Sequence, residues 1–262
     1  MDSHGLYVYG LVRAAGAPEL GEVGLDYRGR PARVHPVAVG DVAAVVSAYE
    51  RDRRVLPLRR NLEPHHRVIH ELANSSTVIP MTFGHVARSQ REVTSVLRRN
   101  AGGVQAELDR LEGKIEMGLK IHWDVPNIFK HIVEGDAGLA ELRDRVFRER
   151  APGQAEKIEL GRRFEERLRS ERASLAERAL QALEAEVAET RTNAPTTEEG
   201  VADLAFLVDR QLQKRFEERV GEIASSWPAQ YVFRCTGPRA PFNFVDLQLA
   251  AGTSRGSREW SS

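Results

Sequence analysis

The sequence predicts an α+β protein built from two domains. Residues 114–123 read K-I-E-M-G-L-K-I-H-W, with an apolar side chain at every second position. This alternation is typical of a β-strand with one buried and one solvent-facing side. Helical patterns lie on both sides of it along the chain, so we interpret it as the first strand of a second sheet. The chain of 262 residues is long enough for two domains with separate cores.

The first predicted domain covers residues 1–112 and begins with strands. Segments rich in aromatic and β-branched residues predict the strands Gly5–Val12, Arg33–Val39 and Val42–Tyr49. Gly40 and Asp41 both tolerate positive φ, so together they predict a two-residue hairpin turn between the second and third of these strands. The stretch Ala14–Pro31 is rich in glycine and proline, and we interpret it as a loop.

Two helices and a further strand complete this domain. Asn61–Ala73 carries apolar residues at helical spacing, and Thr77–Val86 is interpreted as a strand that bends at Pro80. Ser89 is a good N-cap for a second amphipathic helix that extends to Leu111. The order of elements is that of a ferredoxin-like fold in which a loop replaces the first helix. We therefore expect an antiparallel sheet with helices on one face.

The second predicted domain covers residues 113–249 and is also a modified ferredoxin-like antiparallel sheet with helices on one face. Apolar spacings predict short helices from Ile128 to Phe147 and a long helix over Leu160–Leu183, which we interpret as an inserted helical hairpin. The remaining predicted elements are strands at Val187–Asn193, Asp203–Asp209 and Gln230–Cys235 and a helix at Leu212–Ile223. Residues 250–262 are small and polar and predict a disordered tail.

The composition argues against several function classes. Lys+Arg and Asp+Glu both number 38, so the chain has no global electrostatic attraction to nucleic acid or to an anionic membrane. The single cysteine, Cys235, cannot form an intrachain disulfide, and its place in a predicted strand suggests a buried, inert thiol. The sequence contains neither a signal peptide nor a long uninterrupted apolar segment. We therefore expect no nucleic-acid or lipid-membrane partner.

The sequence also contains no complete catalytic or metal-binding motif. His66 and His70 share a helix face next to His65, but the following residues give H-E-L-A-N and lack the second histidine of a zinc-binding H-E-x-x-H. Glycine-rich phosphate loops and the G-x-S-x-G hydrolase motif are absent from the sequence. We therefore expect a protein that is not an enzyme and has no metal, no cofactor and no catalytic residues.

Several segments, taken in order, resemble the GvpL/GvpF family of gas vesicle proteins. They are Leu6–Val12, Asp41–Ser47, Thr77–Val86, Ile115–Lys120, Ala205–Asp209 and Thr236–Val245. The last segment reads T-G-P-R-A-P-F-N-F-V, where the family usually has T-G-P-W-P-P-Y-S-F-V. Arg239, Ala240, Phe242 and Asn243 thus depart from the common residues, as do Met81, Thr82 and His85 in the third segment.

The resemblance implies a non-enzymatic accessory or minor structural protein of gas vesicles in the cytoplasm. Its expected partners are the small, hydrophobic major shell protein, whose aggregation it would prevent during nucleation, and other gas vesicle accessory proteins. Such a partner can pair with an edge strand or place a helix in an apolar groove. We expect the partner contact at Phe83, Met81 and His85. The alternative function is a small-molecule-binding sensor with two ferredoxin-like domains, which a ligand would stabilise against heat.

Overall fold

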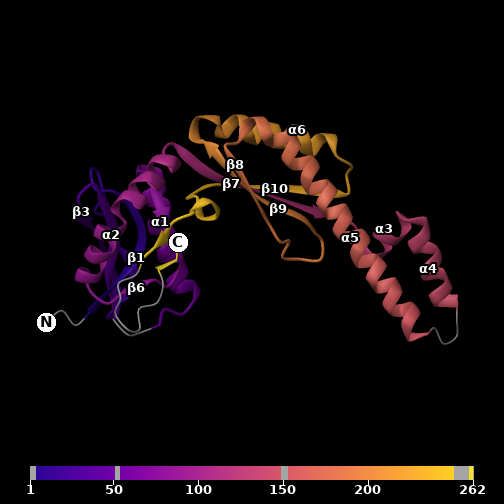
Figure 1. Ribbon diagram of the computed structural model, residues 1–262, viewed down its shortest axis with the longest axis horizontal. Coiled ribbons are helices and arrows are strands. Elements are labelled where there is room, and N and C mark those ends of the chain that lie inside the picture. Colours follow the sequence, from indigo (N-terminus) through magenta and orange to yellow (C-terminus); the bar gives the residue numbers. More distant parts are fainter. Residues whose placement is uncertain (1–3, 51–53, 149–152, 251–259, 262) are drawn as a thin grey trace. The chain divides into compact units, whose positions relative to one another are not determined.

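The computed structural model describes residues 4–50, 54–148, 153–250 and 260–261, which form two compact units (Figure 1). Unit 1 consists of Met1–Glu116 and Pro238–Ser262, and unit 2 is Met117–Gly237. Both units combine antiparallel strands with helices, as predicted. The C-terminal limit of the second domain differs from the expectation. The sequence predicted that this domain extends to residue 249, whereas residues 238–249 belong to unit 1.

Unit 1 contains a six-stranded sheet and two long helices. Five strands follow the order β2-β3-β4-β1-β5, and β6 pairs with β1. The strands are β1 (His4–Arg13), β2 (Gly21–Tyr27), β3 (Arg30–Val39), β4 (Val42–Glu50), β5 (Val78–Pro80) and β6 (Val86–Ala87). The helices are α1 (Arg59–Ser75) and α2 (Gln90–Leu111). The hairpin of β3 and β4 is confirmed, with Val39 opposite Val42 and a φ of 58° at Gly40.

The sheet of unit 1 is buried on both faces, whereas the sequence predicted helices on one face only. Tyr7, Tyr9 and Val45 pack with the buried residues of α1. The alternate residues Val8 and Val46 are also buried, and α2 contacts β1, β3 and β4. A strand with both faces covered needs apolar side chains at consecutive positions and not at every second one. The continuous apolar stretches of β1 and β4 meet that requirement.

The segment interpreted as a loop contains a strand, so that prediction was wrong. β2 passes so close to its neighbours that a Cβ atom on Gly24 would lie 2.7 Å from Tyr9 Oη and 2.8 Å from Ala32 O. The same hydroxyl accepts a hydrogen bond from Leu25 N at 2.9 Å and lies 2.9 Å from Ser47 Oγ. Glycine in β2 therefore permits close packing, although glycine is usually a sign of irregular structure.

The remaining helix and strand predictions for unit 1 differ in detail. Thr77–Val86 is not one bent strand, because a turn that includes Gly84 at a φ of 94° separates β5 from β6. The Ser89 side chain caps α2 as predicted, by accepting a hydrogen bond from Glu92 N. In the C-terminal part, a 3-10 helix (η3, Phe242–Phe244) precedes β11 (Gln248–Leu249), which pairs with β12 (Trp260–Ser261). Apart from Ala250, Trp260 and Ser261, the predicted disordered tail lies outside the described residues.

Unit 2 contains a four-stranded sheet in the order β10-β7-β9-β8. Its strands are β7 (Lys114–Trp123), β8 (Glu189–Asn193), β9 (Gly200–Asp209) and β10 (Tyr231–Arg239). Helices α5 (Gln154–Leu183) and α6 (Gln213–Ser226) contact β9, where the rings of Phe206 and Phe216 lie 5.3 Å apart. The inserted helices are present as α3 (Ile128–Glu134) and α4 (Ala137–Arg148), which contact α5. Cys235 is exposed in β10, so the expectation of a buried thiol was wrong.

Replacing Gly24 with alanine tests the close approach of β2. We expect Gly24→Ala to lower the free energy of unfolding by about 1–3 kcal/mol, because the new methyl group would press on a backbone oxygen. Gly102→Ala is the matched control, since a Cβ atom there meets nothing within 4 Å and alanine favours the helix by about 0.5–1 kcal/mol. Urea unfolding of the full chain measures both effects. Equal stabilities for the two variants would contradict this account of β2.

Candidate functional site

The three residues expected to contact a partner lie in one turn of unit 1, at Met81–His85. Hydrogen bonds to β1 fix both ends of this turn: Met81 N donates to Tyr9 O at 2.9 Å, and Val8 N donates to His85 O at 3.0 Å. Between these bonds the chain leaves the sheet, and Gly84 supplies the positive φ that the turn requires. The turn between β5 and β6 is therefore held in place at both of its ends.

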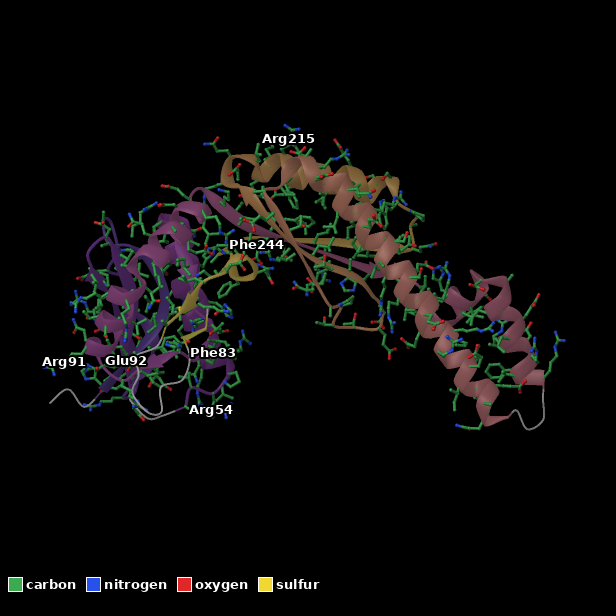
Figure 2. All side chains as sticks on the ribbon, viewed as in Figure 1. Arg54, Phe83, Arg91, Glu92, Arg215 and Phe244 are labelled. Carbon is green, nitrogen blue, oxygen red and sulfur yellow. The ribbon has the colours of Figure 1, made fainter. Side chains whose placement is uncertain are left out.

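The three residues differ in their exposure. Met81 is fully buried, so its side chain supports the turn from within unit 1. Phe83, labelled in Figure 2, is half-buried, and its ring centroid lies 5.4 Å from that of His65 and 6.3 Å from that of Tyr7. His85 is also half-buried, and burial lowers its pKa from 6.5 to about 4.

A buried hydrogen bond between Tyr7 and His65 supports the turn. Tyr7 Oη lies 2.8 Å from His65 Nδ1 and accepts a hydrogen bond from Gly84 N at 3.0 Å. If the hydroxyl donates its proton to Nδ1, the neutral imidazole carries its own proton on Nε2. That Nε2 atom is buried and has no hydrogen-bond partner among the described residues. Burial, with a smaller effect of His66, lowers the pKa of His65 to about 4, and burial raises the pKa of Tyr7.

The outer side of α1 borders a surface hollow of about 640 Å³ within unit 1. Four side chains of α1 line it, together with Glu116 at the start of β7 and four residues that follow or end β10. The lining residues are His66, Arg67, Ile69, His70, Glu116, Arg239, Ala240, Phe242 and Asn243. Its volume lies within the usual range of ligand-binding pockets. The hollow thus joins two parts of the chain that are far apart in the sequence.

Glu116 fixes one wall of this hollow. Its side chain is 0% exposed, and its Oε1 atom accepts hydrogen bonds from Arg239 Nε at 2.8 Å and Asn243 Nδ2 at 2.6 Å. Its Oε2 atom accepts one from Asn243 N at 2.8 Å. Such charge-assisted bonds offset the cost of removing a carboxylate from water. The sequence pattern did not reveal the role of Glu116, because strand alternation placed it on the solvent-facing side of the strand.

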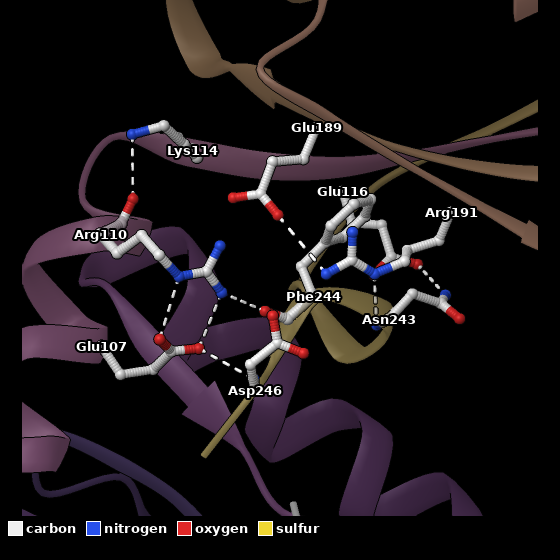
Figure 3. A network of polar contacts seen from close by, with 9 residues as sticks. All are labelled: Glu107, Arg110, Lys114, Glu116, Glu189, Arg191, Asn243, Phe244 and Asp246. Carbon is white, nitrogen blue, oxygen red and sulfur yellow. Dashed lines mark hydrogen bonds and ion pairs between the residues drawn. The ribbon is translucent and has the colours of Figure 1, made fainter.

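A second buried carboxylate secures the same C-terminal segment (Figure 3). Glu107 Oε1 accepts hydrogen bonds from Arg110 Nη2 at 2.8 Å and from Asp246 N at 3.1 Å. Arg110 Nη2 also donates to Phe244 O. Burial raises the pKa of Glu107, but the hydrogen bonds from Arg110 and Asp246 outweigh that effect, so its net pKa is lowered. The segment after β10 is therefore held by side chains of both α2 and β7.

Within the described ranges, no group of three or more His, Cys, Asp or Glu side chains is arranged to hold a metal ion. The predicted neighbours His65, His66 and His70 do not converge: His65 points into the core, whereas the other two line the hollow. No helix in the described part of the chain is long and apolar enough to cross a membrane.

The structure is that of a two-unit α+β protein, and comparisons with known proteins identify its family. The model of the family described as "Gas vesicle synthesis protein GvpL/GvpF" matches residues 5–246. The chain therefore belongs to the GvpL/GvpF family. Gas vesicle protein F of Streptomyces sp. (strain CB03234) is 29% identical over 92% of this chain and 99% of its own. Gas vesicle protein F of Dolichospermum flosaquae is 26% identical over 92% of this chain and 98% of its own.

Solved structures show the same fold. The crystal structure of the gas vesicle protein GvpF from Anabaena sp. PCC7120 matches with a TM-score of 0.77 and 25% identity, covering 94% of this chain and 99% of that one. The crystal structure of GvpF from Microcystis aeruginosa matches with a TM-score of 0.74 at 23% identity, covering 93% and 99%. Family membership over nearly the whole chain supports a role in gas vesicle formation.

Removing the Tyr7 hydroxyl should destabilise unit 1. Tyr7→Phe leaves Gly84 N without its acceptor and His65 Nδ1 without its donor, so we expect a loss of about 1–3 kcal/mol in the free energy of unfolding. Tyr27→Phe is the control, because the Tyr27 hydroxyl forms no hydrogen bond with another described residue. Denaturant titration of both variants measures the difference. A Tyr7→Phe protein as stable as Tyr27→Phe would show that this hydroxyl has no structural role.

Stability should also fall as the pH drops from about 6.5 to about 4. In the unfolded chain His65 takes up a proton near its ordinary pKa of 6.5, whereas in the folded protein it does so near 4. The unfolded state binds more protons between these values, so the stabilisation is complete above pH 6.5 and is lost as the pH falls. This shift corresponds to about 3 kcal/mol. His85 contributes in the same direction.

Unfolding free energies measured across this pH range test the effect. His65→Gln should flatten the pH dependence, and His66→Gln, which removes only the smaller of the two effects on the pKa of His65, should change it far less. A parallel decline in the wild type and the His65→Gln variant would contradict the assignment to His65.

Proposed function

We propose that the protein supports gas vesicle assembly by binding the hydrophobic major shell protein, and that it does so without catalysis. The observation that carries this proposal is the family match over residues 5–246. A small protein with a large exposed apolar surface aggregates unless another chain covers that surface. A folded accessory protein that contacts the shell subunit before it joins the vesicle would prevent this aggregation. The proposed location is the gas vesicle and the surrounding cytoplasm, where other accessory proteins are further partners.

Two exposed leucines of unit 1 offer a fixed apolar contact. Leu56 is 51% and Leu58 is 41% exposed, in the segment that leads into α1. Asn61 Nδ2 donates to Leu56 O at 2.9 Å, Leu58 N donates to the same oxygen at 2.8 Å, and Val55 is buried beside them. Their backbone is therefore held in place while their side chains face water. Because this segment is already ordered, binding of a partner to the two leucines costs little backbone conformational entropy.

The turn that contains Phe83 is the second proposed contact. Phe83 keeps part of its ring accessible, Met81 supports the turn from beneath, and His85 flanks it. The aromatic packing of Phe83 on His65 fixes the direction of the exposed part. A contact here is thus made by Phe83 itself, while Met81 acts indirectly.

Side-chain docking explains the proposed contact better than strand pairing does. The edge strand β2 carries exposed charged residues at Glu22 and Asp26, and the edge strand β10 carries exposed Arg234 and Arg239. Charged side chains on edge strands oppose pairing with another chain. An apolar partner is therefore expected to meet Leu56, Leu58 and Phe83.

Capture of the purified major shell protein by the full chain tests this function. We expect the double variant Leu56→Ser, Leu58→Ser to bind about tenfold more weakly, because it removes exposed apolar contact area without changing the core. Phe83→Ala should also weaken capture, with its folding verified by circular dichroism. Ile158→Ser is the matched control, since this residue is 61% exposed but belongs to α5 of unit 2.

Failure of the wild-type chain to capture the shell protein would refute direct binding. Capture that is equally strong for the wild type, the double variant and Phe83→Ala would retain shell binding but place it elsewhere. Fragments divided between residues 112 and 113 are unsuitable for this test, because residues 238–249 belong to unit 1.

A further inference from the structure

The hollow beside α1 offers hydrogen-bond donors but few acceptors. Its acidic lining residue, Glu116, already accepts hydrogen bonds from Arg239 and Asn243 on both carboxylate oxygens. The other charged lining residues are arginines. A ligand of the hollow must therefore bring acceptor groups of its own.

Arg67 is the best-placed donor. It is exposed on α1, and it forms no ion pair with any other residue in the described ranges. Arg239, in contrast, uses Nε and Nη2 to hold Glu116. A guanidinium group that lacks a carboxylate partner can bind one in a bidentate arrangement.

His70 adds a second donor to the same side of the hollow. Asn74 Nδ2 lies 3.1 Å from His70 Nε2, and an amide nitrogen can only donate, so Nε2 is the acceptor. The neutral ring then carries its proton on Nδ1. One turn of α1 thus presents Arg67 and His70 to the hollow.

The floor of the hollow is apolar. Ile69 and Ala240 are each 2% exposed, and Phe242 is half-buried. A ligand that fills the hollow therefore needs an apolar group next to its acceptors. The lining residues of α1 lie in the middle of that helix, where the backbone N–H groups are already used, so the phosphate-binding amides of a helix N-terminus are missing.

We propose that this hollow is a docking site for an acidic segment of a partner protein. The segment places a carboxylate on Arg67, within reach of His70, and an apolar side chain on the floor formed by Ile69, Ala240 and Phe242. A peptide segment is preferred over a free phosphate ion because only the segment brings an apolar side chain that can cover the floor. The site is separate from Leu56, Leu58 and Phe83, and it does not depend on binding of the major shell protein.

The test is a titration of the ¹⁵N-labelled full chain with a defined peptide pool, followed by NMR. The pool contains end-blocked hexapeptides in which Leu, Ile or Phe alternates with Glu or Asp. A matched pool carries Gln or Asn in place of the acids, and ATP serves as the phosphate-bearing competitor. We expect the acidic pool to shift the amide signals of residues 66–70 and 240–243 saturably, and the neutral pool to bind at least about tenfold more weakly, as expected for the loss of a charge-assisted hydrogen bond.

Substitutions at two exposed arginines locate the binding. Arg67→Gln should weaken the acidic pool about tenfold, and Arg67→Lys should restore part of the affinity because it keeps the charge. Arg91→Gln, an exposed position on α2, is the control and should bind like the wild type. Thermal melting verifies that each variant is folded.

Three results would overturn the proposal. They are the absence of saturable shifts at the hollow, equal affinity for the acidic and neutral pools, and an Arg67→Gln protein that binds like the wild type. Tighter binding of ATP at the same residues would replace the protein segment with a nucleotide ligand. Shell-protein capture by the same Arg67→Gln variant is measured in parallel, so failure at the hollow is distinguished from failure of shell binding.

Discussion

The hydrogen bonds to the buried Glu116 carboxylate determine where the C-terminal part of the chain lies in unit 1. A carboxylate with 0% exposure is tolerated only when its oxygens accept strong hydrogen bonds, and here Arg239 and Asn243 donate them. The position of Ala240 in the core and of Phe242 against it follows from this arrangement. The same bonds create the hollow beside α1, because they hold its second wall in place.

Hydrogen bonds to two buried tyrosine hydroxyls fix further segments on the core-facing side of α1. The hydroxyl groups of Tyr7 and Tyr9 are buried in the core of unit 1, and each bonds a backbone N–H group of a neighbouring segment: Gly84 N for Tyr7 and Leu25 N for Tyr9. A buried hydroxyl without a partner is costly, so these bonds select one position for the turn at Phe83 and one for β2. The local irregularities of unit 1 are therefore fixed by side chains of β1.

The sequence predicted those elements whose pattern reflects a single local environment. The strand Lys114–Trp123, the turn at Gly40-Asp41 and the Ser89 cap all depend on neighbours within a few residues, and all three elements are confirmed, although the expected solvent-facing side of the strand is partly buried. Glu116 and Gly24 were misinterpreted because their environments are made by distant residues. The burial of Glu116 depends on Arg239, more than a hundred positions later, and Gly24 is required by the side chain of Tyr9. Arg239 and Asn243, noted in the sequence as departures from common residues of the family, are the two that bind Glu116.

The discontinuity of unit 1 has a physical consequence for folding. Closing a contact between Glu116 and Arg239 in a flexible chain carries an entropic cost that rises with the length of the intervening segment. In this protein the intervening segment is unit 2, and its strands β7 and β10 are hydrogen-bonded neighbours in one sheet. The chain passes from unit 1 to unit 2 near the start of β7 and returns near the end of β10. Formation of the sheet therefore brings these two points of the chain together. The sheet of unit 2 thus replaces a long flexible loop by a short structured connection, and the C-terminal segment can reach Glu116 with little further loss of entropy.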